Sequence, residues 1–270
     1  MTGAHALRAV SALVERELLR SLRQPGRLFA ALLRPLLWLA VFAAGFRNVF
    51  GIAIVEPYDT YVPYETYIAP GLVGMVLLFN GMQSSLALVV DRELGVLRAL
   101  LAAPLPRPLL LGAKLLAAAL QSLLQAAAFV VIALMLGTEL PLQWTRLLSV
   151  SIAAFAAALM LAALGLLLTV HVKQLENFAG TMNFVVFPMY FLSTALYPLW
   201  KLEESGARWV FELARLNPFT HAVEWMRFAW YGKDPGLAPV VVIAIGLLCF
   251  AFACIGYDPQ RGFTPARRAA

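Results

Sequence analysis

Long apolar runs, separated by short polar connections, dominate the chain from residue 28 onward. Six of these runs reach or exceed the roughly 20 mainly apolar residues that a helix needs to cross about 30 Å of hydrocarbon. Because the connections are short, the pattern predicts an all-α integral membrane protein with a single transmembrane domain over residues 1–270. The predicted spans are residues 28–50, 67–90, 108–137, 147–171, 177–199 and 236–256.

The first 27 residues have a different, amphipathic pattern. Apolar residues from Leu7 to Leu22 recur at helical spacing, and Arg8, Glu15 and Arg16 take the other side. This pattern predicts a helix over residues 1–27 that lies in the membrane surface. It is not typical of a cleavable signal, because a polar helical pattern precedes the apolar run. The alternative is a basic flank that only orients the first span.

Composition and charge agree with a membrane protein and suggest its orientation. The chain is 61% hydrophobic and 13% charged, far from the roughly 25% charged residues of a soluble domain. With a cytoplasmic N-terminus, thirteen of the 21 Lys and Arg residues lie inside and seven outside, and Arg34 remains within the first span. We therefore expect both termini in the cytoplasm and the chain in the cytoplasmic (inner) membrane of a bacterium.

Residues 200–235 are the exception to this charge bias. Five basic residues there are matched by five acidic residues, and eight aromatic residues lie among them. Balanced charge and aromatic side chains suit short helices at a membrane interface. We expect an extracytoplasmic segment, interfacial or re-entrant, before the last span.

The sequence offers no catalytic or metal-binding pattern. Cys249 and Cys254 lie five apart in the last apolar run, which favours packing residues over a disulfide or a metal pair. The three histidines lack metal-ligand spacing, and no phosphate-binding loop occurs. We expect no enzyme site and no nucleic-acid partner. If ATP drives this protein, another chain binds it.

The stretch DRELGVLRALLAAPLPR, residues 91–107, interrupts the apolar pattern. On a helical wheel its leucines share one side, and Asp91, Gly95 and Arg98 form a narrow face opposite. Pro104 and Pro106 end the predicted helix. A short cytoplasmic helix over 91–103 with a thin polar face fits a groove on a partner. A surface helix that only joins two spans is the alternative.

The run YETYIAPGLVGMVLLFNGMQSSLALVVDRELGVLRALLAAPLPRPLLLGAKLL, residues 64–116, resembles the membrane subunit of type-two ABC exporters. The order of Tyr, Pro-Gly, Asp-Arg-Glu-x-Gly, Leu-Arg and Ala-Pro carries the resemblance. Residues 23–46 and 187–227 agree with it, and the similarity is greater to the branch that exports drugs and lipo-oligosaccharides.

The resemblance implies that this chain is half of a transporter and pairs with a second permease copy, which we expect to be identical. Membrane lipids would surround the pair. Two separate ATPase subunits would bind ATP and magnesium. The resemblance also assigns ATPase coupling to the helix after the second span and to the N-terminal helix. Residues 171–177 would make a smaller contact with the ATPase. The implied coupling residues are Asp91, Arg92, Glu93, Gly95, Arg98, Glu15, Arg16 and Arg20.

Polar residues inside spans tend to face other helices or a water-filled path. Hydrogen bonding between helices is the alternative, above all for Gln121 and Gln125. The resemblance places the transport route between subunits, along the second and fifth spans. The expected route residues are Asn80, Met82, Gln83, Asn183, Met189 and Tyr190. Arg34 and Lys114 lie near the cytoplasmic edge, where they can snorkel, so we assign them only anchoring.

A path lined by methionine, aromatic and amide side chains suits an amphipathic cargo such as a drug, a lipid or a lipid-linked sugar, moved outward by alternating access. A secondary transporter is one alternative, although such proteins usually carry internal repeats and a buried ionisable residue near the midplane, which we do not detect. A non-transporting membrane scaffold is the other.

Overall fold

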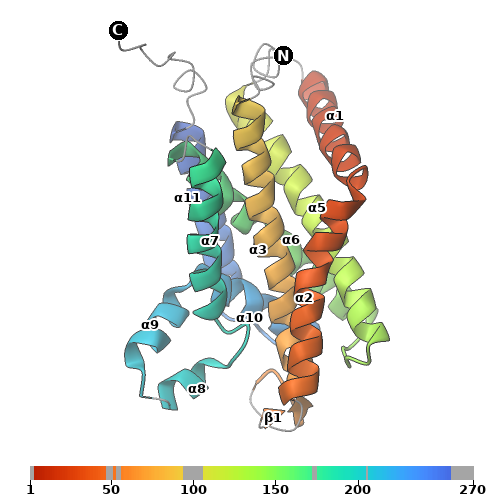
Figure 1. The fold of residues 1–270 in the computed structure, drawn as a ribbon, viewed down its shortest axis with the longest axis vertical. Helices are drawn as coiled ribbons and strands as arrows, with labels where there is room; N and C mark the ends of the chain where they lie inside the picture. The colour runs from red at the N-terminus through yellow and green to blue at the C-terminus, as the bar shows by residue number, and fades with distance from the viewer. Residues whose placement is uncertain are drawn as a thin grey trace.

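A computed structural model describes residues 3–46, 51–52, 56–93, 106–171, 175–204 and 206–256. The chain forms an all-α bundle, with one short antiparallel pair of strands in which Gly51 lies opposite Pro63 (Figure 1). The described elements are α1 (Gly3–Leu22), α2 (Pro25–Phe46), β1 (Gly51–Ile52), β2 (Val62–Pro63), α3 (Tyr64–Glu93), α5 (Arg107–Met135), α6 (Trp144–His171), α7 (Leu175–Phe191), α8 (Leu199–Glu204), α9 (Arg208–Leu216), α10 (Pro218–Tyr231) and α11 (Ala238–Gly256).

Four of the described helices, α3, α5, α6 and α11, are long and apolar enough to cross a membrane. The first and fifth predicted spans overlap α2 and α7, neither of which is among these four helices. The apolar part of α2 is Phe29–Phe42, and α7 has 17 residues, about 26 Å at 1.5 Å per residue. The count of six membrane crossings stays a prediction.

The core forms where α3 and α6 pack against each other, with α5, α10 and α11 around them. Small residues allow this close approach, as they do in many membrane helix pairs. Ala157 and Ala158 of α6 are fully buried, and a Cβ on Gly81 of α3 would lie 3.0 Å from the backbone nitrogen of Ala162. Glycine at position 81 therefore lets the two backbones meet.

The segment after α7 is helical, as expected, but only part of it has the surface position that its aromatic residues suggested. In α9 the side chain of Trp209 is exposed, whereas Trp230 of α10 is buried with Phe219 and Met226. The reason is that α10 packs among α3, α6 and α11. Its first turn is fixed by Asn217, whose side chain accepts from the Phe219 backbone N–H and donates to the Met189 carbonyl.

The bundle has two distinct ends (Figure 1). The start of α1 and the last turns of α3 and α11 lie at one end, and α8, α9 and β1 lie at the other. A small apolar cluster of Leu88, Leu111, Leu166 and Ala253 closes the first end by joining α3, α5, α6 and α11. We call the end of the bundle that contains the start of α1 the α1 end, and the opposite end the α9 end.

Candidate functional site

Helix α1 brings a row of charged residues against the α1 end of the bundle. The helix packs along α5, with Val14 and Ser21 buried and Leu7 and Leu22 exposed. Of the residues 1–27 predicted to form an amphipathic helix, Gly3–Leu22 do so, and part of the inner face of this helix contacts protein. Its position in the membrane surface stays a prediction. Glu17 and Arg20 lie close enough to this face to reach residues of α3 and α5.

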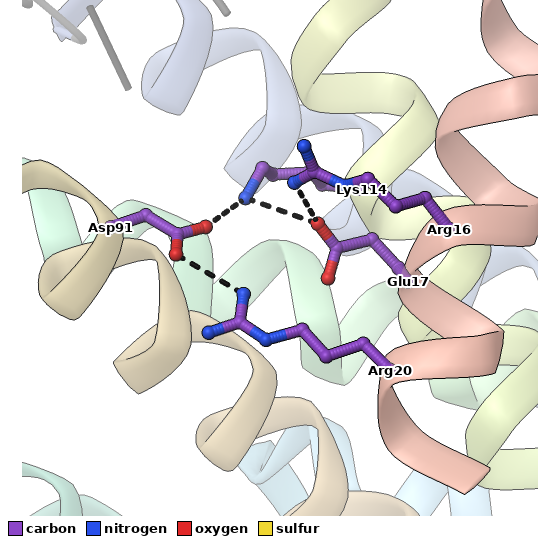
Figure 2. A network of polar contacts seen from close by, with 5 residues as sticks. All are labelled: Arg16, Glu17, Arg20, Asp91 and Lys114. Atoms are coloured by element: carbon purple, nitrogen blue, oxygen red, sulfur yellow. Dashed lines mark hydrogen bonds and ion pairs between the residues drawn. The ribbon is translucent and has the colours of Figure 1, made fainter. Parts of the chain in front are cut away.

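Asp91, in the last turn of α3, is the centre of an ion-pair cluster (Figure 2). Its side chain is 2% exposed. One carboxylate oxygen accepts from the Lys114 ammonium of α5 at 2.7 Å, and the other accepts from the Arg20 guanidinium of α1 at 3.2 Å. A single carboxylate thus joins three helices.

Glu17 completes the cluster from the α1 side. Its carboxylate lies 3.6 Å from the Lys114 ammonium and accepts a 2.9 Å hydrogen bond from Arg16. Lys114 is 12% exposed and Arg20 is 44% exposed. Because exposed ion pairs contribute only about 0 to 1 kcal/mol, the buried contact between Asp91 and Lys114 dominates the energetics of the cluster.

The structure places the expected coupling residues in different surroundings. Asp91 and Arg20 bond to each other, so the Asp91 carboxylate holds α1 and α5 together and does not point outward to a partner. Glu15, Arg16 and Glu93 are exposed. The side chain of Arg92, together with Gly95 and Arg98, lies outside the described residues, as does most of the helix expected over 91–103.

Sequence reasoning missed Glu17 and gave Lys114 only an anchoring role. Lys114 does lie near the bundle end, but its ammonium is turned inward to Asp91. The available signal was a lysine and an aspartate in two successive predicted helices, both close to the connection between them. The pairing of Lys114 with Asp91 could be predicted from their closeness in the sequence. The contacts of α1 with these two residues could not, because α1 is far from them in the sequence.

A polar seam continues from the cluster between α3 and α5. The Asn80 amide donates to Ser122 at 2.7 Å, and Ser122 donates to the Ala118 carbonyl. Gln121 and Gln125 are buried, and among the described residues their amide nitrogens have no hydrogen-bond partner. Next to the cluster, a hollow of about 40 Å³ is lined by residues of α1, α3 and α5, including Ser84 and Gln121.

The expected route residues are dispersed. Met82 and Tyr190 are buried in the core of the single chain, because α3 and α7 turn these side chains inward. Asn80 bonds across to α5, which is the arrangement of a helix-helix contact. Asn183 is exposed on α7, and Gln83 and Met189 are half-buried. The structure therefore gives more support to Asn183 than to Met82 or Tyr190 as a route residue, and all six assignments stay predictions.

Among the described residues, no group of three or more His, Cys, Asp or Glu side chains could hold a metal ion. The two cysteines are free thiols, one buried and one half-buried. The charged cluster is instead suited to holding α1, α3 and α5 together by ion pairs.

Comparison with known proteins identifies relatives over most of the chain. The family described as ABC-2 type transporter matches residues 8–231, from within α1 to the last residue of α10. A protein named transport permease ycf38 from Porphyra purpurea is 28% identical over 229 residues, covering 84% of this chain and 76% of its own length. Proteins of the same name from Pyropia yezoensis and Cyanophora paradoxa are 28% identical over 252 residues and 30% over 241. They cover 91% and 85% of this chain, and 82% and 77% of their own lengths.

Proposed function

Because this chain belongs to the ABC-2 type transporter family, we propose that it is the permease subunit of an ATP-driven exporter whose ATPase is a separate chain. The observation that carries the proposal is the family match, which includes α1, the end of α3 and α10. In this assignment ATP and magnesium bind to the partner, and this chain is a non-catalytic membrane subunit.

The ion-pair cluster supplies a physical link between an ATPase and the bundle. The segment after Glu93 is the proposed ATPase contact, and it begins three residues beyond Asp91. A partner that moves this segment also moves the last turn of α3. Through Lys114 and Arg20 the same displacement reaches α5 and α1. Movement at one point is thereby distributed over three helices.

A second copy of the permease completes the proposed exporter. Apolar side chains are exposed on α2 at Phe29, Leu33 and Leu37 and on α7 at Phe184 and Phe187. These faces can contact lipid or another copy, and Asn183 lies among those of α7. A route between two copies beside α7 would be lined by aromatic and amide groups, which suits an amphipathic cargo moved outward across a cytoplasmic membrane.

The coupling segment can be tested by substitution. Gly95→Leu removes a glycine from the interior of the helix expected over 91–103, which favours that helix by about 1 kcal/mol, yet it fills the space that a partner needs. We expect Gly95→Leu and Arg98→Glu to lose ATPase binding during co-purification, or to uncouple hydrolysis from export. Arg8→Glu, on the outer part of α1, is the control and should retain both. Normal coupling in both coupling variants would reduce the segment to a connector.

The proposed orientation places the α9 end outside the cell. In a background without Cys249 and Cys254, a cysteine at the exposed Glu204 should react with an impermeant thiol reagent added to intact cells. A cysteine at Arg8, exposed on α1, should react only after the cells are broken. Labelling of the two positions in the opposite order would contradict the orientation.

A further inference from the structure

A separate hollow lies at the α9 end, between α10, the start of α3 and the turn that follows α7. It has a volume of about 160 Å³, far more than the roughly 15 Å³ that one water needs. Its lining combines aromatic rings, including Tyr58, Trp200 and Phe228, with polar groups from Thr194, Glu224 and Arg227. The family assignment gives this hollow no role.

Arg227 of α10 is held rigidly in the wall of this hollow. Its side chain is 2% exposed, and one guanidinium nitrogen donates to the Thr194 carbonyl at 2.7 Å. A second nitrogen pairs with Glu224, and the guanidinium carbon lies 4.1 Å from the centre of the Tyr67 ring. The guanidinium is therefore positioned before any ligand arrives.

Four polar atoms of residues that line the hollow are buried without a hydrogen-bond partner in the described part of the chain. They are Oη of Tyr58, Nε of Arg227, Oγ1 of Thr194 and Nε1 of Trp200. Buried polar atoms of native proteins are nearly all paired, so four such atoms around one hollow point to an external partner. Nε of arginine and Nε1 of tryptophan can only donate, whereas a threonine hydroxyl can donate and accept.

The charges and rings around the hollow restrict the chemistry of that partner. Glu224 neutralises Arg227, and Glu56 adds a further carboxylate to the lining, which disfavours an anion. A quaternary ammonium is disfavoured as well, because the Arg227 guanidinium already lies over the Tyr67 ring and the Lys201 ammonium over the Trp200 ring. Burial raises the pKa of Tyr58, so this phenol stays neutral. A neutral ligand with several hydroxyls meets all of these conditions.

We propose that this hollow binds one neutral sugar ring, either from a free saccharide or as the head group of a glycolipid. The hydroxyls of the ring accept from Arg227 and Trp200 and exchange hydrogen bonds with Thr194. Its C–H groups pack against the aromatic walls. This inference goes beyond the proposed function and is independent of it, because binding requires neither ATP nor a partner chain.

The test uses the full chain in phospholipid nanodiscs prepared without glycoside detergents. Saturation-transfer NMR measures binding of a panel of methyl hexopyranosides, with choline and inorganic phosphate as competitors. Loss of one hydrogen bond should weaken binding about fivefold or more in Thr194→Val and in Trp200→Phe. Thr220→Val and Trp209→Phe are matched controls, since both residues lie outside the lining, and they should bind like the wild type.

Trp200 lies on a short helix with no buried residue, so Trp200→Phe should fold even if Thr194→Val does not. Absence of hexopyranoside binding by the wild type would overturn the inference. So would equal binding by Trp200→Phe and Trp209→Phe, or displacement of the sugar by choline or phosphate. A glucosyl diacylglycerol added to the nanodiscs distinguishes the two sources: competition with the free glycoside indicates a lipid head group, and its absence indicates a free saccharide.

Discussion

Asp91→Asn is expected to loosen the contact of α3 with α5 and α1 and to lower the free energy of unfolding by about 3 kcal/mol. The substitution removes the negative charge that faces Lys114, which is 12% exposed and, among the described residues, keeps Glu17 as an acidic neighbour at 3.6 Å. Breaking one partner of a buried ion pair typically costs about 3 to 5 kcal/mol, and the partial hydration of this cluster favours the lower value. Denaturant titration in micelles, followed by tryptophan fluorescence, measures the loss.

The matched control is Glu15→Gln on the exposed face of α1, which should change stability by less than about 0.5 kcal/mol. Combining Asp91→Asn with Lys114→Met should restore much of the loss, since no buried charge then remains unpaired. Stability of Asp91→Asn within about 0.5 kcal/mol of the wild type would show that the cluster does not hold α1, α3 and α5 together.

Gly71→Ala is expected to be nearly as damaging, although it adds one methyl group. A Cβ at position 71 would lie 2.7 Å from the Cα of Ala195, in the turn after α7. Because the clash is with backbone, the turn must move, and overpacking of this kind costs about 1 to 3 kcal/mol. The same turn supplies the Thr194 carbonyl that binds Arg227, so its displacement should also loosen α10. Thermal unfolding in micelles measures the effect.

Gly180→Ala provides the comparison, because nothing lies within 4 Å of a Cβ at that helical position. It should be neutral or stabilising by up to about 1 kcal/mol, as expected for alanine in a helix. Equal stability of the two variants would mean that α3 and the turn after α7 are not in the close contact described.

The apolar pattern predicted the long helices well, because a long run of apolar residues is itself the signal. The second, third and fourth predicted spans, 67–90, 108–137 and 147–171, differ by at most three residues at each end from α3, α5 and α6. The last, 236–256, coincides with α11 except for its first two residues. For these elements hydropathy alone contains the necessary information.

The same signal failed at the end of α7. The predicted span ran to residue 199, whereas the helix ends at Phe191 and the chain turns back. Distant side chains stabilise this turn: Tyr64 donates to the Leu196 carbonyl and Asn217 donates to the Leu192 carbonyl. A hydropathy profile does not detect hydrogen bonds between residues 25 or 132 positions apart.

Contacts between residues distant in the sequence also limited what could be predicted about the ion-pair cluster. The sequence singled out Asp91 and Arg20 as charged residues of interest, but their mutual contact spans 71 positions. Without knowledge of how α1 packs, both were expected to meet a partner chain. Tertiary contact gives Asp91 an internal role, and the coupling assignments of the residues that follow it stay predictions.

The proposed function is tested most directly by ATP-dependent transport in proteoliposomes that contain this chain and its partner ATPase. A fluorescent amphipathic lipid reports movement between leaflets, with ion gradients abolished by ionophores. We expect movement only when both chains, ATP and magnesium are present, and none when the ATPase cannot hydrolyse ATP. Movement by this chain alone, driven by an ion gradient and indifferent to ATP, would contradict the account and identify a secondary transporter.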